Sequence, residues 1–186
     1  MTIELHHSTL DELESMIDGY LPPSESVGDP LDEDCDDNTT RIYIQNLNGL
    51  MWNKDGGRWP YVCEAMDSIQ ADISCFSELN VDTNNYDVRR KMESICQRQF
   101  THNKLILSAS KYKSPTLYKP GGTAILIRNQ MTASIKSHTR DRMGRWTSIG
   151  IHTNHRKIRV ISAYQVCQSR NQGTTTIASQ QIAQII

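Results

Sequence analysis

Beyond residue 40, apolar residues recur along the chain with periods that predict strands and helices in turn. Residues 41–46 alternate in the manner of a strand and run into the turn signal Asn48-Gly49. A helix is predicted over roughly residues 58–70, because four apolar residues recur there at positions i, i+3, i+4 and i+7. Residues 71–76 form a short, mainly apolar run, which predicts a second strand.

The rest of the chain is predicted to be richer in strands than in helices. One further helix is predicted around residues 88–96, with Asn84 or Asn85 as its N-cap, and another over residues 174–186. Apolar alternation predicts four more strands, at residues 104–107, 123–128, 146–152 and 157–164. This mixture of elements indicates an α/β fold.

Charge is distributed unevenly about residue 40. Residues 1–40 contain 12 acidic residues and no Lys or Arg, whereas residues 41–186 contain 9 acidic and 20 basic residues. The first segment is also rich in Pro, Ser and Gly, and it has too little apolar area to offset the entropy of ordering. We therefore predict an acidic, mostly disordered leader at 1–40 and a folded domain at 41–186. The leader is either a solvated linker or an arm that shields the basic domain from nucleic acid.

The sequence also restricts the compartment in which the protein is expected to work. No segment approaches the roughly 20 apolar residues that span a bilayer, and the N-terminus lacks the pattern of a secretory signal. The five cysteines are widely spaced with no C-x-x-C pair, which argues against structural zinc and favours free thiols in a reducing compartment. We therefore predict an intracellular protein, nuclear or cytoplasmic, that is neither secreted nor membrane-bound.

Three polar residues fall where predicted strands end, namely Asn46, Glu78 and Tyr164. Folds of the α/β class commonly bind ligands at the carboxyl ends of their strands. Each residue alone is a weak signal, since a Glu that follows an apolar strand is usually a solvated strand end. Their order along the chain, together with the motifs around them, is more specific.

Five motifs occur in the order typical of one superfamily. They are Asn46 to Leu50, Ser77-Glu78, Gly121 to Leu126, Gly144-Arg145-Trp146 and Ala163-Tyr164. Together they resemble the first part of the endonuclease/exonuclease/phosphatase superfamily, which includes apurinic endonucleases, DNase-I-like nucleases, inositol polyphosphate phosphatases and endonuclease domains of non-LTR retrotransposons. The Gly-Gly-Thr variant and the run Ile-Gln-Asn-Leu-Asn-Gly are most similar to the retroelement members, so the resemblance implies a retroelement origin.

The resemblance implies the first half of a four-layer α/β sandwich, in which two mixed sheets pack together and are flanked by helices. The family's later motifs, Gly-Asp-x-Asn and Ser-Asp-His, do not occur after Tyr164. Half of such a domain leaves strand edges and apolar faces without partners. We therefore predict association through exposed sheet edges, or poor solubility, when residues 1–186 are expressed alone.

The chemistry that the resemblance implies is phosphodiester hydrolysis assisted by Mg²⁺ or Mn²⁺. Mg²⁺ takes oxygen ligands and is often held by one or two carboxylates, with waters and phosphate oxygens completing its shell. By resemblance, Glu78 is the metal carboxylate, and Asn46 shares the metal or orients Glu78 or a bound water. Tyr164 would hydrogen-bond the scissile phosphate, and Asn48 and Arg145 would be further substrate contacts. The base that activates water belongs to the absent motifs, so we expect little catalysis from this chain alone.

The basic excess of residues 41–186 fits a polyanionic partner. Its Lys and Arg residues form three clusters, Arg89–Lys91, then Lys111, Lys113 and Lys119 beside two tyrosines, then Arg140, Arg142 and Arg145 beside Trp146. Phosphate contacts by such groups give salt-dependent affinity that is independent of sequence. We predict a nucleic-acid substrate, with DNA expected before RNA. Two alternatives stay open: a phosphatase of phosphoesters such as inositol phosphates, and a nucleic-acid-binding protein without catalysis.

Overall fold

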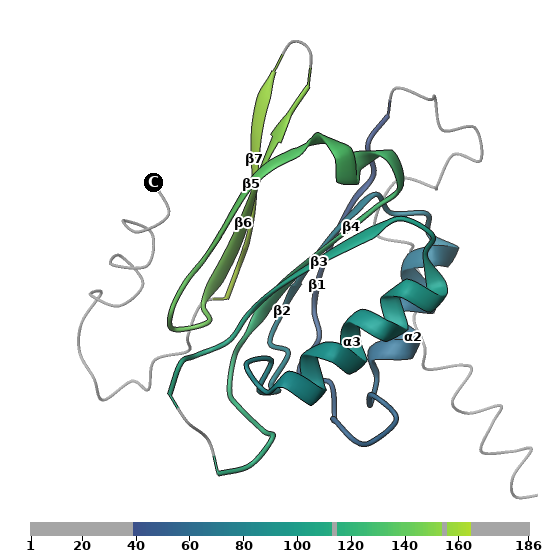
Figure 1. The fold of residues 1–186 in the computed structure, drawn as a ribbon. Coiled ribbons are helices and arrows are strands. Elements are labelled where there is room, and N and C mark those ends of the chain that lie inside the picture. The colour runs from purple at the N-terminus through teal and green to yellow at the C-terminus, as the bar shows by residue number, and fades with distance from the viewer. Residues whose placement is uncertain (1–38, 113–114, 154–155, 165–186) are drawn as a thin grey trace, which may run out of the picture. The chain divides into compact units, whose positions relative to one another are not determined.

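Two β-sheets and two α-helices make up the part of the chain that the computed structural model describes, residues 39–112, 115–153 and 156–164 (Figure 1). All of these residues belong to the second of the two units into which the chain divides, Met1–Asp37 and Asn38–Ile186. The predicted leader and the helix predicted over residues 174–186 lie outside the described residues. No helix in the described part of the chain is long and apolar enough to cross a membrane.

The first sheet is mixed and has the strand order β1-β2-β4-β3. Its strands are β1 (Ile42–Asn46), β2 (Ile73–Ser77), β3 (Asn103–Ser108) and β4 (Thr123–Arg128). Strands β1 and β2 are parallel, and the other neighbouring pairs are antiparallel. Each strand lies within two residues of its predicted position, and β4 coincides with it.

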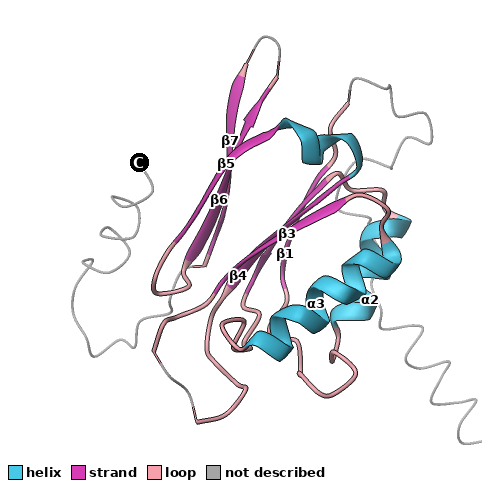
Figure 2. Cartoon of the chain, viewed as in Figure 1, coloured by secondary structure: helices cyan, strands magenta, loops and turns pink. Residues whose placement is uncertain are grey.

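Helices α2 (Trp59–Ser68) and α3 (Tyr86–Gln99) cover one face of this sheet (Figure 2). Helix α2 connects β1 to β2 and has Pro60 in its first turn, where the missing N–H of proline is tolerated. Helix α3 begins at Asn85, whose side chain accepts hydrogen bonds from the backbone N–H groups of Asp87 and Val88. The predicted choice of Asn84 or Asn85 as N-cap is thereby resolved in favour of Asn85.

The second sheet consists of β5 (Ile135–Arg140), β6 (Trp146–His152) and β7 (Lys157–Ala163), and these strands are antiparallel throughout. The described strands of this second sheet are therefore antiparallel, whereas the resemblance implies a mixed sheet. Strand β5 and the 3₁₀ segment η1 before it (Asn129–Ser134) were not predicted. All residues of β5 after Ile135 are exposed, so this edge strand lacks the apolar alternation that marks a half-buried strand.

Two separate cores lie on the two faces of the first sheet. Along β4, Ala124 and Leu126 face the helices, whereas Ile125 and Ile127 face the second sheet, as the period of two in a strand requires. Trp59 is fully buried in the helix-side core and contacts Phe76 edge to face at a centroid distance of 5.6 Å. The described residues thus form three layers, with helices, first sheet and second sheet in that order (Figure 2).

At one end of the sandwich, buried hydroxyl groups replace the isoleucines between the sheets. The Thr123 and Thr147 hydroxyls lie 2.8 Å apart and join β4 to β6, and the Ser162 hydroxyl donates to the Phe76 carbonyl at 2.8 Å and joins β7 to β2. The Ser108 hydroxyl donates to the Asp141 carbonyl at 2.9 Å. We call these four side chains the hydroxyl layer. Because each hydroxyl has a partner, the layer fixes the two sheets together at low energetic cost.

Three described cysteines, Cys63, Cys75 and Cys96, are buried free thiols. The sulfur atoms of Cys63 on α2 and Cys96 on α3 lie 3.9 Å apart. This contact with Cys96 and burial together raise the pKa of Cys63 far above its ordinary range. Burial raises the pKa of Cys75 to about 11. The thiols of Cys63 and Cys75 are therefore inert at neutral pH.

Candidate active site

The parallel strands β1 and β2 bring two of the predicted residues together. Asn46 and Ser77 are register partners at the carboxyl ends of these strands. The chains continue side by side beyond that point, with hydrogen bonds of 2.9 Å from Leu47 N–H to the Ser77 carbonyl and of 2.8 Å from Gly49 N–H to the Glu78 carbonyl. The polar residues that follow the two strands therefore meet at one edge of the first sheet.

Asn46 and Glu78 are in direct contact at this edge. The Asn46 Nδ2 group donates a hydrogen bond of 2.9 Å to Glu78 Oε1. The Oδ1 atom of the same amide accepts a hydrogen bond of 2.9 Å from Asn48 N–H. Because both ends of the amide are engaged, Asn46 is held in one orientation and in turn holds the Glu78 carboxylate.

The backbone of Glu78 has an uncommon conformation. Its φ is +54°, and Asn48 and Asn80 nearby have φ values of +46° and +51°. Asn visits this left-handed region readily, whereas Glu does so rarely. Such a backbone costs roughly 1–3 kcal/mol per residue and is concentrated at functional sites. The chain thus keeps a strained backbone at Glu78, the residue that brings a carboxylate to this edge.

Asn80 connects this edge to the loop before β4 and to Tyr164. Its N–H donates to the Gly121 carbonyl at 2.8 Å, and its Oδ1 accepts from Gly121 N–H at 2.9 Å. Gly121 has a φ of +79°, and a Cβ there would lie 3.3 Å from two atoms of the Tyr164 ring. Glycine is therefore needed both for the turn and for the ring that packs over it. The motifs in the sequence did not single out Asn80, although its place two residues after Glu78 was a usable signal.

Arg145 is engaged by an acidic neighbour. Its Nε donates to Asp141 Oδ2 at 2.8 Å, and its carbonyl accepts a hydrogen bond of 2.7 Å from Tyr164 N–H. Burial raises the pKa of Asp141, but hydrogen bonds from the Arg145 side chain and from the N–H groups of Met143 and Arg145 outweigh burial and hold the pKa below its ordinary value of 3.8. Arg145 therefore positions the strand end that carries Tyr164, and its predicted contact with substrate stays a prediction.

The predicted basic cluster at residues 111–119 is not uniform. The Lys119 side chain is buried and forms an ion pair of 2.8 Å with Asp82. It also donates to the Ser110 carbonyl at 2.9 Å. Lys119 is thus a structural cation, whereas Lys111 is exposed. Lys113 lies outside the described residues.

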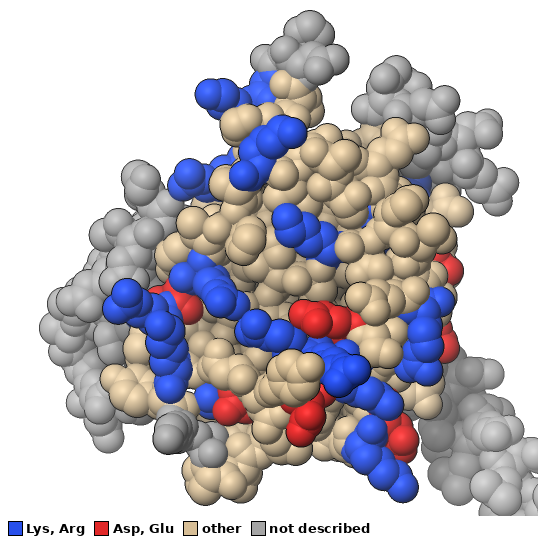
Figure 3. Space-filling view, viewed as in Figure 1, with Lys and Arg blue, Asp and Glu red and all other residues tan. Residues whose placement is uncertain are grey.

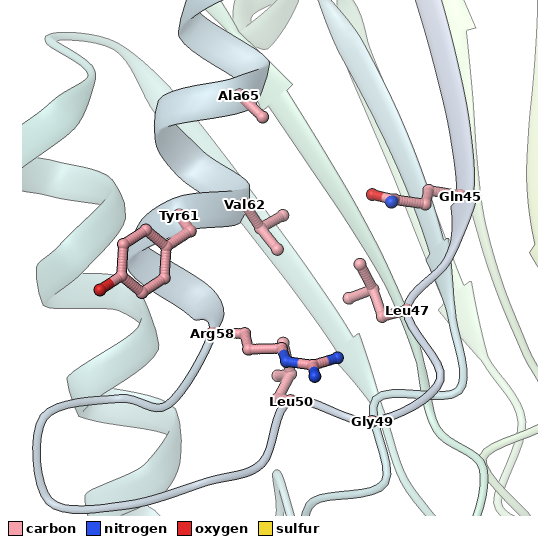
Figure 4. A pocket seen from close by; sticks show the side chains of 8 residues that line it. All are labelled: Gln45, Leu47, Gly49, Leu50, Arg58, Tyr61, Val62 and Ala65. Atoms are coloured by element: carbon pink, nitrogen blue, oxygen red, sulfur yellow. The ribbon is translucent and has the colours of Figure 1, made fainter. Parts of the chain in front are cut away.

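An apolar hollow of about 490 Å³ opens between β1 and α2, beside the loop that follows β1. Figure 4 shows Leu47 and Val62 lining it from opposite sides, with the Arg58 guanidinium group near Leu50 and Gly49. Gln45 points into this hollow. Because strand side chains alternate, Asn46 lies on the opposite face of β1 from Gln45.

The donor set at the strand ends suits a hard cation only in part. Among the residues that the structure describes, no three His, Cys, Asp or Glu side chains gather in a way that could hold a metal ion. Glu78 is the carboxylate of this set, and the amide oxygens of Asn46 and Asn48 are its other oxygen donors, although Asn46 Oδ1 already accepts a hydrogen bond from Asn48 N–H. Mg²⁺ keeps several waters and is commonly bound by one or two carboxylates with substrate phosphates, so this donor set fits Mg²⁺ or Mn²⁺ as part of a weak site.

Comparison with known proteins identifies the fold. The structure is similar to an endonuclease/exonuclease/phosphatase family protein from Leptotrichia buccalis C-1013-b, with a TM-score of 0.55 and 15% identity over 80% of this chain and 63% of that chain. It is also similar to D. rerio TDP2 complexed with single-strand DNA product, with a TM-score of 0.51 and 14% identity over 78% of this chain and 52% of that chain. The described residues therefore have part of the α/β fold of endonuclease/exonuclease/phosphatase proteins.

Other comparisons limit how far this result extends. The endonuclease domain of TRAS1, a telomere-specific non-LTR retrotransposon, matches with a TM-score of 0.44 and 14% identity over 79% of this chain and 54% of that chain. A likeness of that degree carries no argument about a retroelement origin. No protein-family model matches the sequence, and a comparison with curated proteins gives no match. The chain spans less than two thirds of the length of each of these solved structures.

Proposed function

We propose that this chain carries the first part of the active site of a divalent-metal-dependent phosphodiesterase that acts on nucleic acid. The observation that carries the proposal is the contact between Asn46 and Glu78, 2.9 Å, at the joined carboxyl ends of β1 and β2. The fold supports it, since the similar proteins belong to a nuclease and phosphatase family. The proposal includes the first half of a four-layer sandwich of retroelement type, for which the motifs in the sequence are the support.

In this proposal Glu78 binds the cation through its carboxylate, and Asn46 orients that carboxylate. The cation, when bound, would stabilise the negative charge that develops on the phosphate during hydrolysis. Tyr164, held over Gly121, hydrogen-bonds a phosphate oxygen of the substrate, and Asn48 makes a further contact. A site with a single carboxylate has low affinity for a divalent cation. This chain alone is therefore expected to bind metal weakly and to hydrolyse phosphodiesters slowly.

The proposed partner is DNA, within the nucleus or cytoplasm. Residues 41–186 contain 20 basic and 9 acidic residues, which favours a polyanion. D. rerio TDP2, one of the similar proteins, is known in complex with single-strand DNA product.

Binding of Mn²⁺ to the full chain tests the metal site directly. We expect the wild-type chain to bind Mn²⁺, measured by electron paramagnetic resonance, and Glu78→Gln to lose that binding. Glu64→Gln is the matched control, because Glu64 is an exposed carboxylate on α2. Any nicking of supercoiled plasmid by the chain should require the metal and Glu78. Equal Mn²⁺ binding by wild type and Glu78→Gln would overturn the proposal.

A second candidate is a nucleic-acid-binding protein without catalysis. The observation in its favour is that, among the described residues, no group of three or more His, Cys, Asp or Glu side chains could hold a metal ion. Under this alternative, DNA binding falls as salt rises and is unchanged by Glu78→Ala, while Mn²⁺ binding is absent from the wild type as well.

A further inference from the structure

A second hollow, of about 210 Å³, opens at the same end of the sandwich as Glu78. It lies beside β3, which is the edge strand of the first sheet opposite β1. Its lining combines the end of β3, residues 107–109, with side chains from three other segments. These are Asn84, Lys111, Arg140, Asp141 and Arg142. We call this hollow the basic pocket.

The basic pocket is built by hydrogen bonds between segments that are distant in sequence. Asn84 Nδ2 donates to the Ser110 carbonyl at 2.7 Å, and Lys111 N–H donates to the Arg142 carbonyl at 3.0 Å. Ser110 also forms an isolated β-bridge with Met143. The backbone positions of Lys111 and Arg142 are therefore fixed relative to each other, although the sequence places them in two separate clusters.

The charge of the basic pocket is not neutralised by its own acidic residue. Asp141 is paired with Arg145 at 2.8 Å, so that pair contributes no net charge. Over the described ranges, Lys111, Arg140 and Arg142 take part in none of the ion pairs, and all three are exposed. Lys and Arg side chains gather over the turn between β5 and β6 (Figure 3). Three like charges around one hollow favour an anion with several oxygen acceptors.

We propose that the basic pocket binds a backbone phosphate of a single-stranded nucleic acid whose scissile phosphate lies at Glu78. This inference rests on the proposed function and names its substrate class. Strand β4 separates β2 from β3, so the basic pocket lies roughly 10 Å from the end of β2, measured across the end of the sheet. The two guanidinium groups suit phosphate geometry, and Lys111 adds a point charge.

Tyr112 supports a single strand as the ligand. It directly follows Lys111, and its side chain is 71% exposed. An exposed aromatic ring beside a basic groove is the arrangement on which the unpaired bases of single strands stack. A duplex keeps its bases paired and would leave this ring unused.

Binding of a fluorescent 12-nucleotide single-stranded DNA to the full chain, in EDTA over a salt series, tests the proposal. We expect the triple variant Lys111→Ala, Arg140→Ala, Arg142→Ala to bind about tenfold more weakly, with a log–log salt dependence shallower by about 2, or about 0.7 for each lost contact. The matched control removes three exposed basic residues elsewhere on the second sheet, Lys136, Lys157 and Arg159. It should bind within about twofold of the wild type.

Two further variants separate the possible causes of a loss. Exchanging the cations for one another (Lys111→Arg, Arg140→Lys, Arg142→Lys) should restore most of the affinity if charge, and not folding, is responsible. Tyr112→Ala should weaken binding about fivefold or more, whereas Tyr61→Ala should not, although Tyr61 is 70% exposed on α2.

Failure of the phosphate site can be distinguished from failure of the proposed function. Glu78→Gln should bind DNA in EDTA at least as tightly as the wild type, because the basic pocket does not include Glu78 and the change removes a negative charge beside the proposed scissile phosphate. If Glu78→Gln binds Mn²⁺ like the wild type while the pocket triple still weakens DNA binding, the proposed function fails and the phosphate site stands. Equal affinity and salt dependence for the pocket triple and the control triple would overturn the phosphate site.

Discussion

The side-chain amide of Asn46 donates a 2.9 Å hydrogen bond to the carboxylate of Glu78, which lies 32 residues further along the chain. The contact depends on the parallel pairing of β1 with β2, which brings two strand ends to one edge. It also depends on the Asn48 N–H group, which engages the other end of the Asn46 amide. The orientation of Glu78 is thus set by its neighbours before any ligand binds.

Removing the Asn46 amide, which holds the Glu78 carboxylate, should weaken metal binding. We expect Asn46→Ala to lower the affinity of the chain for Mn²⁺ about tenfold or more, because partners that orient a metal ligand are typically worth 10–100-fold. Gln45→Ala is the control, since Gln45 points into the hollow beside α2 (Figure 4). Mn²⁺ titrations would measure both variants, and an unchanged affinity in Asn46→Ala would contradict this role.

The Asp141 carboxylate should contribute to stability at neutral pH and lose that contribution in acid. Its pKa is lowered in the folded protein, so the stabilisation is present above the unfolded value of 3.8 and disappears as the pH falls through the lower folded value. We expect Asp141→Asn to lower the free energy of unfolding by about 2 kcal/mol at pH 7. Urea unfolding at falling pH should show the difference shrinking below pH 3.8. Asp55→Asn, at an exposed loop position, is the control.

Breaking the Lys119–Asp82 ion pair on one side should be more costly than replacing both partners. We expect Lys119→Met to lower the free energy of unfolding by about 3 kcal/mol, because it leaves Asp82 largely buried without its cation. The double variant Asp82→Asn, Lys119→Met should recover part of that loss. Chemical unfolding of the two singles and the double would give the coupling energy, and additive losses would show that the pair is not coupled.

The buried thiols should react only when the protein opens. The pKa of Cys75 is about 11, two units above its ordinary 9.0, which lowers its thiolate fraction about 100-fold near neutral pH. We expect iodoacetamide to modify Cys63, Cys75 and Cys96 far more slowly in the native chain than in urea. Peptide mass spectrometry would resolve each site. Rapid native modification of Cys63 would show that α2 and α3 separate readily.

The outer edge of β1 should promote association of the chain. Within the described residues β1 pairs on one side only, and Ile44 is 77% exposed on it. A charged residue on an edge strand opposes edge-to-edge pairing. We expect light scattering to show concentration-dependent association of the wild type, reduced in Ile44→Lys. A monomeric wild type at all concentrations would contradict the predicted association through sheet edges.

The elements with a buried face could be predicted from the sequence. The run from Thr123 to Arg128 is buried throughout, and its prediction as a strand is confirmed to the residue. Strand β5 could not be found in the same way, since its pairing with β6 holds it in place while its side chains after Ile135 are exposed. Periodicity reports burial, and it is silent where backbone hydrogen bonds alone define a strand.

Contacts between distant segments explain what the sequence missed at the site. Lys119 looks like any other lysine of a basic cluster, and only the fold shows that Asp82 neutralises it. Asp141 neutralises Arg145 in the same way. Conversely, Lys111 and Arg142 belong to different clusters in the sequence and to one basic pocket in the structure. Charge counting along a chain overestimates the cations available to a ligand and does not show where they meet.

The hydroxyl layer should slow the opening motions of the strand ends that carry the candidate site. Loops at a ligand-binding edge usually open far more easily than the core, and their amide hydrogens exchange quickly with solvent. Here the hydroxyls of Thr123 and Ser162 join the two sheets directly beneath the strand ends. The Leu47 and Gly49 amides, hydrogen-bonded to Ser77 at the end of β2 and to Glu78 after it, should therefore exchange only when the sheets themselves part. An edge held in this way acts as a rigid receptor, and any adjustment of shape on binding falls to the ligand.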